Sequence, residues 1–167
     1  DPGNNVVENP SFESGTESWA ASGTAAASAG SAHDGSQSAA LTALGDKVAQ
    51  TLLTEVGKTY DLSVWINAAG MTSEKVVFDT QDQYDDTCQF IITGPNGGWT
   101  EYAGSFAATN TSVTLRAFTS GTFAGIVYID HIVLTENLDG PIAGYEAWAV
   151  SNSVTGISTD DDDRDGR

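Results

Sequence analysis

Hydrophobic and polar residues alternate with a period of two in several segments of this chain. The two clearest segments are residues 61–67 and 112–118. Successive side chains of a β-strand point to opposite faces, so each segment is predicted to be a strand with one buried face. The side chains predicted to face the core are Leu62, Val64, Ile66, Val113, Leu115 and Ala117. Those predicted to face outward are Asp61, Ser63, Trp65, Asn67, Thr114, Arg116 and Phe118.

Turn residues separate these strands from further ones. Residues 101–106 also alternate, and residues 125–136 read as a long, strongly apolar strand. Gly57, Gly70, Asn96-Gly97-Gly98 and Ser120-Gly121 mark turns between the runs. Short strands at this spacing, without helical segments between them, predict an all-β fold, an antiparallel β-sandwich or jelly roll.

The composition agrees with one domain followed by an appendage. The chain has 167 residues, 18 of them glycine, and its hydrophobic fraction of 40% is enough for a core. We expect the sandwich to span residues 1–136. The composition changes in residues 137–167, where we expect a linker containing Pro141, a short helix at residues 145–150 and an acidic tail. The apolar runs fall far short of a membrane span.

The charge of the chain argues against anionic partners. There are 23 acidic and 6 basic residues, which gives a formal net charge of -17. Such a field repels phosphate backbones and anionic lipid headgroups, so we expect neither nucleic acid nor a membrane surface as a partner. Cys88 is the single cysteine and cannot form an internal disulfide; it is predicted to be a small buried hydrophobe.

Six short motifs follow one another along residues 4–136 in an order that is itself distinctive. They are Asn9-Pro10-Ser11-Phe12-Glu13-Ser14-Gly15 with Trp19, His33-Asp34-Gly35-Ser36-Gln37-Ser38, Val48-Ala49-Gln50, Gly57-Lys58-Thr59-Tyr60-Asp61-Leu62-Ser63-Val64-Trp65, Trp99-Thr100-Glu101-Tyr102, and Tyr128-Ile129-Asp130-His131-Ile132-Val133-Leu134. In this order the chain resembles carbohydrate-binding modules of the family four, nine and twenty-two type. The resemblance implies a jelly roll, a structural calcium, and sugar binding on a concave sheet face or at loop tips. It also implies no catalysis and a place beside a glycoside hydrolase or polysaccharide lyase.

The resemblance implies a calcium site that ties the first segment to the last strand. Glu13 and Asp130 would clamp the ion, and backbone oxygens of Ser11 and of the Asp34-Gly35 turn would complete its shell. Calcium takes six to eight hard oxygen ligands, which such a set can supply. From the residues alone, the alternative is that Glu13 caps a turn and Asp130 pairs with a nearby cation.

The acidic tail fits the first half of a second calcium loop. Asp161, Asp163 and Asp165 alternate before Gly166, as in D-x-D-x-D-G. The segment resembles the truncated start of a dockerin-like or thrombospondin-type calcium repeat, because the chain stops before the expected glutamate. The alternative is a solvated acidic tail.

Outward aromatic and polar residues predict a sugar-binding groove. Sugars stack their C–H faces on aromatic rings and exchange hydrogen bonds with neighbouring polar groups. The predicted groove floor consists of Trp65, Phe118, Arg116, Gln89, Asn67 and Asp79, with Tyr84 in an overhanging loop. Alternatively, loops cover Trp65 and Phe118, which then only pack. Trp19 is expected in the core, whereas Trp99 could seal the core or border a loop-tip site.

Catalysis is the weakest of three functional hypotheses. Asp79, Asp82, Asp85 and Asp86 could supply an acid–base pair, but acidic residues are abundant throughout the chain. We therefore expect a secreted, noncatalytic module that binds a polysaccharide or oligosaccharide and targets a covalently attached catalytic domain. The net charge favours a neutral β-glycan over sulfated or uronate polymers. The second hypothesis is a structural or adhesive calcium-stabilised spacer.

Overall fold

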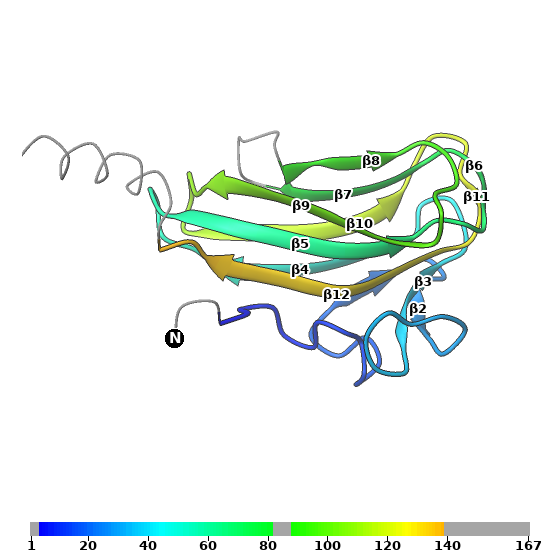
Figure 1. Cartoon of the computed structure of the whole chain (residues 1–167), viewed down its shortest axis with the longest axis horizontal. Coiled ribbons are helices and arrows are strands. Elements are labelled where there is room, and N and C mark those ends of the chain that lie inside the picture. Colours follow the sequence, from blue (N-terminus) through cyan, green and yellow to red (C-terminus); the bar gives the residue numbers. More distant parts are fainter. Residues whose placement is uncertain (1–3, 82–87, 139–167) are drawn as a thin grey trace, which may run out of the picture.

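The alternating segments form two antiparallel sheets that pack face to face (Figure 1). The structure, a computed structural model, describes residues 4–81 and 88–138. One sheet, here called the β5 sheet, has the order β2 (Ala26–Ser28), β3 (Ser38–Leu41), β12 (Val127–Glu136), β5 (Thr59–Asn67) and β9 (Trp99–Ala107). The other, the β10 sheet, has the order β1 (Ala20–Ser22), β4 (Lys47–Leu53), β10 (Ser112–Thr119), β7 (Val76–Gln81) and β8 (Phe90–Ile92). A small pair, β6 (Met71–Ser73) with β11 (Ala124–Gly125), joins one end. The predicted β-sandwich of jelly-roll type is confirmed.

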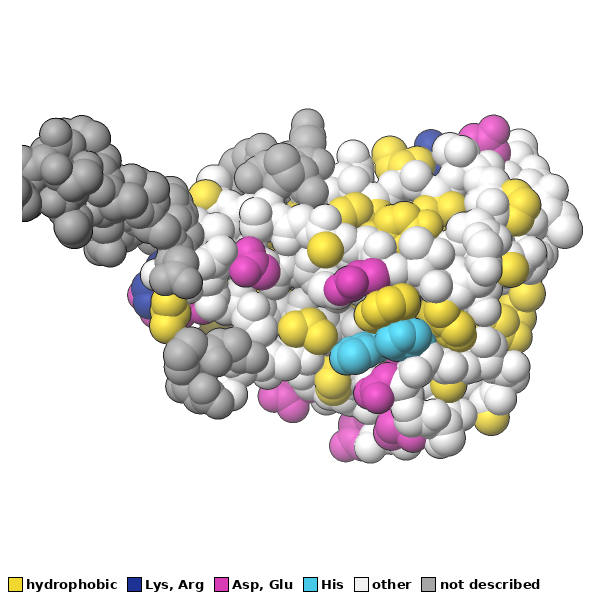
Figure 2. Space-filling model, viewed as in Figure 1, with side chains coloured by type: hydrophobic (Ala, Val, Ile, Leu, Met, Phe, Trp, Pro, Cys, Tyr) yellow, Lys and Arg dark blue, Asp and Glu magenta, His cyan; other side chains and the backbone are white. Residues whose placement is uncertain are grey.

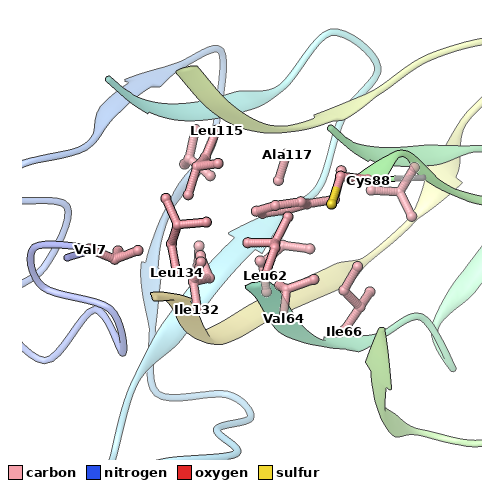
Figure 3. Packing of buried hydrophobic residues seen from close by; sticks show 14 of the residues in the cluster. Val7, Leu62, Val64, Ile66, Cys88, Leu115, Ala117, Ile132 and Leu134 are labelled. Atoms are coloured by element: carbon pink, nitrogen blue, oxygen red, sulfur yellow. The ribbon is translucent and has the colours of Figure 1, made fainter. Parts of the chain in front are cut away.

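The core lies between the two sheets and is built from the inward halves of the alternating strands (Figure 3). Leu62, Val64 and Ile66 of β5 are at most 1% exposed, and the predicted inward residues of β10 are fully buried. Burying such side chains removes apolar surface from water at about 25 cal/mol per Å², which holds the sheets together. The predicted burial of Trp19 and Cys88 is also confirmed, and the Trp19 ring lies 5.1 Å from that of Phe12.

The first described segment continues the β5 sheet where β3 ends. On its β12 side, β3 pairs with residues 127–129, which are the first three residues of that strand. Beyond that point, the N–H of Val6 donates to the Leu134 carbonyl at 2.9 Å, and the N–H of Ile132 donates to the Pro10 carbonyl at 3.1 Å. The segment thus runs antiparallel to the last strand and satisfies backbone groups that β3 leaves without a strand partner.

A β-bulge interrupts β12 on the same sheet. Asp130 pairs with Trp65 and Val133 pairs with Ser63, so β12 has one more residue than β5 between these pairs. His131 occupies the left-handed region there, with a φ of 52°. A bulge re-aims side chains and bends the strand. Here it places Asp130 and His131 together at the middle of the sheet.

The boundary between sandwich and appendage stays a prediction. β12 ends at Glu136, which agrees with the expected end of the sandwich. The predicted linker lies outside the described residues except for Asn137 and Leu138. The predicted helix and calcium loop, including Asp161, Asp163 and Asp165, lie wholly outside them. The described ranges contain no helix long and apolar enough to cross a membrane.

Candidate functional site

The predicted groove residues lie on opposite outer faces of the sandwich. Trp65 and Asn67 belong to β5, whereas Arg116 and Phe118 belong to β10 and Asp79 to β7. The prediction that they share one groove floor is therefore wrong. Alternation correctly separates inward from outward positions, but it does not say which sheet a strand joins. Gln89 is exposed just before β8 of the β10 sheet, and Tyr84 lies outside the described residues.

On the outer face of the β10 sheet, the predicted groups contact one another. Arg116 donates from Nε and Nη2 to the two carboxylate oxygens of Asp79, at 2.9 and 2.7 Å. The guanidinium carbon lies 4.7 Å from the centre of the Phe118 ring, in cation–π distance. We call this surface the ion-pair face. Its charges and its aromatic ring are largely engaged within the protein.

The outer face of the β5 sheet is hollowed. A depression of about 360 Å³ is lined by Asp61, Leu62, Ser63, Ala103, Gly104, Ser105 and Val133. On β5 and β9, Ser63 lies opposite Ala103 and Asp61 lies opposite Ser105, so small side chains face each other across the strands. These short side chains leave room that larger residues would fill. We call this surface the groove face.

Aromatic rings gather at one end of the groove face. His33 stacks on Trp65 with the ring centres 3.8 Å apart and the planes within 14°. The ring centre of Trp99 lies 5.8 Å from that of His33, and Nδ1 of His131 is 3.3 Å from Nδ1 of His33. Figure 2 shows the two histidines in cyan, side by side on this face and next to hydrophobic and acidic side chains.

Acidic and hydroxyl groups border these rings. Glu101 lies opposite Trp65 on β9 and accepts a hydrogen bond of 2.7 Å from the Ser63 hydroxyl. Asp61 accepts a hydrogen bond of 3.2 Å from the side-chain amide of Asn137. Ring faces beside carboxylate and hydroxyl oxygens suit a ligand with C–H faces and many hydroxyl groups.

The sequence interpretation missed three contributors to this face, namely His33, His131 and Glu101, and it left open whether Trp99 seals the core or borders a binding site. The alternation of residues 101–106 already placed Glu101 on the polar side of its strand. The pairing of β9 with β5, which brings Glu101 beside Trp65, depends on residues far apart in the sequence. No local signal placed His33 on Trp65.

The loop that carries His33 is fastened to the groove face by hydrogen bonds. The hydroxyl oxygen of Ser31 accepts from Nε1 of Trp99 at 3.1 Å and from Nδ2 of Asn67 at 3.4 Å. The backbone N–H groups of His33 and Asp34 donate to Oδ2 of Asp130 at 2.7 and 2.8 Å. Asn67 and Asp130 thus help to position the loop.

Glu13 holds the other end of the same loop. Its carboxylate accepts N–H donors from Ser36 and Gln37 at 2.7–3.0 Å, and the Ser36 hydroxyl donates at 2.8 Å. The backbone hydrogen bond from Ser36, followed by its hydroxyl and the N–H of Gln37, lowers the pKa of Glu13. Gly35 has a φ of 76°, and a Cβ there would lie 2.5 Å from the carboxyl carbon of Glu13.

The predicted calcium residues surround this loop, and their charges suit a cation. Burial raises the pKa of Asp130, since its amide donors do not outweigh the loss of water, and the charge of Asp34 raises it further. The charge of Asp34 also opposes, without reversing, the lowering of the Glu13 pKa. The Ser11 hydroxyl donates to Asp34 at 2.7 Å. A divalent cation would relieve the repulsion between these carboxylates.

The arrangement of the predicted calcium ligands supports a metal site less well than their charge does. Among the residues that the structure describes, no group of three His, Cys, Asp or Glu side chains is arranged to hold a metal ion. Amide N–H groups of the loop face Glu13 and Asp130 and occupy part of their carboxylate oxygens. The two carboxylates therefore already stabilise the loop through hydrogen bonds.

Comparison with known proteins now adds to the geometry. A family model described as a carbohydrate binding domain matches residues 4–122. No curated protein matches the chain.

Several solved structures share the fold. The structure of TmCBM61 in complex with β-1,4-galactotriose is 17% identical, with 80% of this chain and 99% of that chain covered and a TM-score of 0.64. The CBM22-1 xylan-binding domain from Paenibacillus barcinonensis Xyn10C is 16% identical, with coverages of 81% and 96% and a TM-score of 0.62. The Clostridium thermocellum Xyn10B CBM22-1–GH10 modules, complexed with xylohexaose, are 20% identical, with coverages of 80% and 28% and a TM-score of 0.58.

Proposed function

The chain belongs to the carbohydrate binding domain family, and from this membership we propose that it binds a neutral β-glycan on its groove face. The observation that carries the proposal is the hollow lined by Ser63 and Ala103, because the next outward positions along the same two strands are Trp65 and Glu101. A pyranose ring can rest its C–H face on the aromatic end while its hydroxyl groups donate to the acidic oxygens. The family is noncatalytic, so binding is the activity.

The local charge supports a neutral ligand. Asp61 and Glu101 border the groove, and in the described part of the chain neither forms an ion pair with a cation. A uronate or sulfate group would meet these carboxylates and be repelled. Arg116, which could have bound an acidic sugar, lies on the other face and is paired with Asp79.

We propose that the module is secreted and raises the concentration of an attached glycoside hydrolase or polysaccharide lyase on its polymer. Tethering converts the second encounter into an intramolecular one, so no further chemistry is needed from the module. One of the similar structures combines a binding module with a GH10 module, which supports this arrangement. A structural or adhesive spacer is the alternative, and it differs by predicting no retention on any glycan.

Affinity electrophoresis tests the binding proposal. The gels would contain xylan, β-1,4-galactan, a mixed-linkage β-glucan or polygalacturonate, and the variants would be Trp65→Ala and Phe118→Ala. We expect at least one neutral gel, and not the polygalacturonate gel, to retard the wild type. Trp65→Ala should lose at least tenfold in affinity, about 1.4 kcal/mol, whereas Phe118→Ala on the ion-pair face should not. Equal migration of wild type and Trp65→Ala in every gel would refute the proposal.

We also propose that Glu13 and Asp130, with oxygens of Ser11 and Asp34, hold a structural calcium. When bound, the ion would supply positive charge between carboxylates that otherwise repel one another. A ligand that binds the folded state raises the melting temperature. We expect calcium to raise it for the wild type and for Glu101→Gln, and to raise it less for Glu13→Gln. An unchanged melting temperature after thorough chelation would remove the calcium proposal and leave glycan binding standing.

A further inference from the structure

The outermost ring on the groove face belongs to His33. The side chain of His33 is exposed, whereas Trp65, on which its ring stacks, is half-buried. The two rings are stacked face to face, 3.8 Å between centres and 14° between planes. Of the two stacked rings, the imidazole is therefore the one more accessible to an approaching ligand.

The backbone of His33 is held in place at several points. Its N–H and that of Asp34 donate to the fully buried carboxylate of Asp130. Two residues earlier, Ser31 accepts hydrogen bonds from Trp99 and Asn67. Moving the loop away from Trp65 would remove two of the backbone N–H donors of a buried carboxylate, which is unfavourable. The stack is thus part of the resting surface.

One ring nitrogen of His33, Nε2, points away from His131. Nδ1 of His33 lies 3.3 Å from Nδ1 of His131. Within the described residues, this is the hydrogen bond that the His33 ring forms. Nε2 lies on the opposite side of the imidazole and can exchange a hydrogen bond with a hydroxyl group. The ring therefore offers a flat face and a polar edge, the two features that a pyranose uses.

We infer that His33, supported by Trp65, is the ring on which the glycan stacks, so that the platform of this site is a tryptophan–histidine pair two rings deep. The inference rests on the proposed function and assigns the contact to a residue that local pattern does not single out. Trp65 supports one face of the His33 ring. His131 fixes the imidazole from the side.

The opposite arrangement, in which His33 covers Trp65 and leaves when sugar arrives, makes a different prediction. Removing a cover exposes the indole and strengthens binding, whereas removing the platform weakens it. The anchors at Asp130 and Ser31 favour the platform, because a cover must be displaced at each binding event.

Calorimetric titration with xylohexaose, β-1,4-galactotriose and cellohexaose separates these arrangements. The proteins would be wild type, His33→Ala, His33→Phe and Phe118→Ala, each checked for folding by circular dichroism. For an oligosaccharide that the wild type binds, we expect His33→Ala to weaken binding at least tenfold. His33→Phe should recover most of the affinity because it restores a ring face, and Phe118→Ala should match the wild type.

The possible results fall into distinct classes. If His33→Ala binds as tightly as the wild type or more tightly, His33 is a bystander or a cover and the inference is overturned. If His33→Phe loses as much affinity as His33→Ala, the inference is also overturned, because a ring face at this position then does not make the contact. If the wild type binds none of the three oligosaccharides and no gel polysaccharide, the proposed function itself fails, and this inference fails with it.

Discussion

The groove face and the ion-pair face use similar residues in different ways. On the ion-pair face, Asp79 neutralises Arg116, and the guanidinium covers Phe118. On the groove face, Glu101 accepts a hydrogen bond from the neutral Ser63 hydroxyl, and small residues line the adjoining hollow. An aromatic ring beside polar groups therefore does not identify a binding surface by itself. What distinguishes the groove face is that its acceptors have neutral partners and that it has space above them.

The largest expected effect comes from filling the hollow. Ala103→Trp places a large ring in the depression from an exposed position, so we expect glycan affinity to fall at least a hundredfold, about 2.7 kcal/mol. The matched change Thr51→Trp, at an exposed position of the ion-pair face, should leave affinity unchanged. Calorimetric titration of both variants measures the difference. Equal losses in both would remove the distinction between the faces.

A smaller effect is expected from disturbing the loop that carries His33. Gly35→Ala introduces a Cβ against the Glu13 carboxylate at a positive φ, so we expect the free energy of unfolding to fall by about 2 kcal/mol. Glycan affinity should fall severalfold because His33 shifts. Gly94→Ala, where a Cβ meets nothing within 4 Å, is the control and should change stability by less than about 0.5 kcal/mol. Urea unfolding provides the measurement, and an unchanged Gly35→Ala would contradict the role of Glu13.

On the ion-pair face, stability should change and binding should not. Asp79→Asn removes the negative charge that accepts two hydrogen bonds from Arg116, while keeping the shape of the side chain. The Arg116 side chain is 25% exposed, so water screens part of the loss, and we expect about 1 kcal/mol of destabilisation. Urea unfolding and glycan titration of the same sample test both halves. Weaker glycan binding without unfolding would place the ligand on this face instead.

The smallest expected effect is on how the stability of the fold depends on pH. The hydrogen bonds from Ser36 and Gln37 lower the pKa of Glu13, so the folded state holds its charged form. The resulting stability is present above the unfolded value of 4.5 and is lost as the pH falls through the lowered pKa. We expect Glu13→Gln to flatten the decline of stability below pH 4.5, measured by urea unfolding, relative to Glu17→Gln. An identical decline in both variants would be evidence against this contribution.

Local pattern was enough to predict the strands but not their neighbours. The inward positions of β5 and β10 follow from alternation alone, because a strand with one buried face must alternate. Grouping Trp65 with Arg116 failed because sheet membership depends on pairing between distant segments. The position of His33 depends on Glu13 and Asp130, which are far apart in the sequence and meet at the loop only in the folded chain.

The antiparallel course of the first segment along β12 also sets how this fold responds to tension. A load applied between Asn5 and Asn137 pulls from the same edge of the sheet, so the Val6–Leu134 bond opens first and the Pro10–Ile132 bond follows. Bonds that open one after another yield at a lower force than bonds that must shear together. The segment also carries Val7 and Phe12, whose side chains are buried in the core. Stretching would therefore first open the backbone pairing of this segment with β12, and further extension would draw these two side chains out of the core while the other strands are still paired.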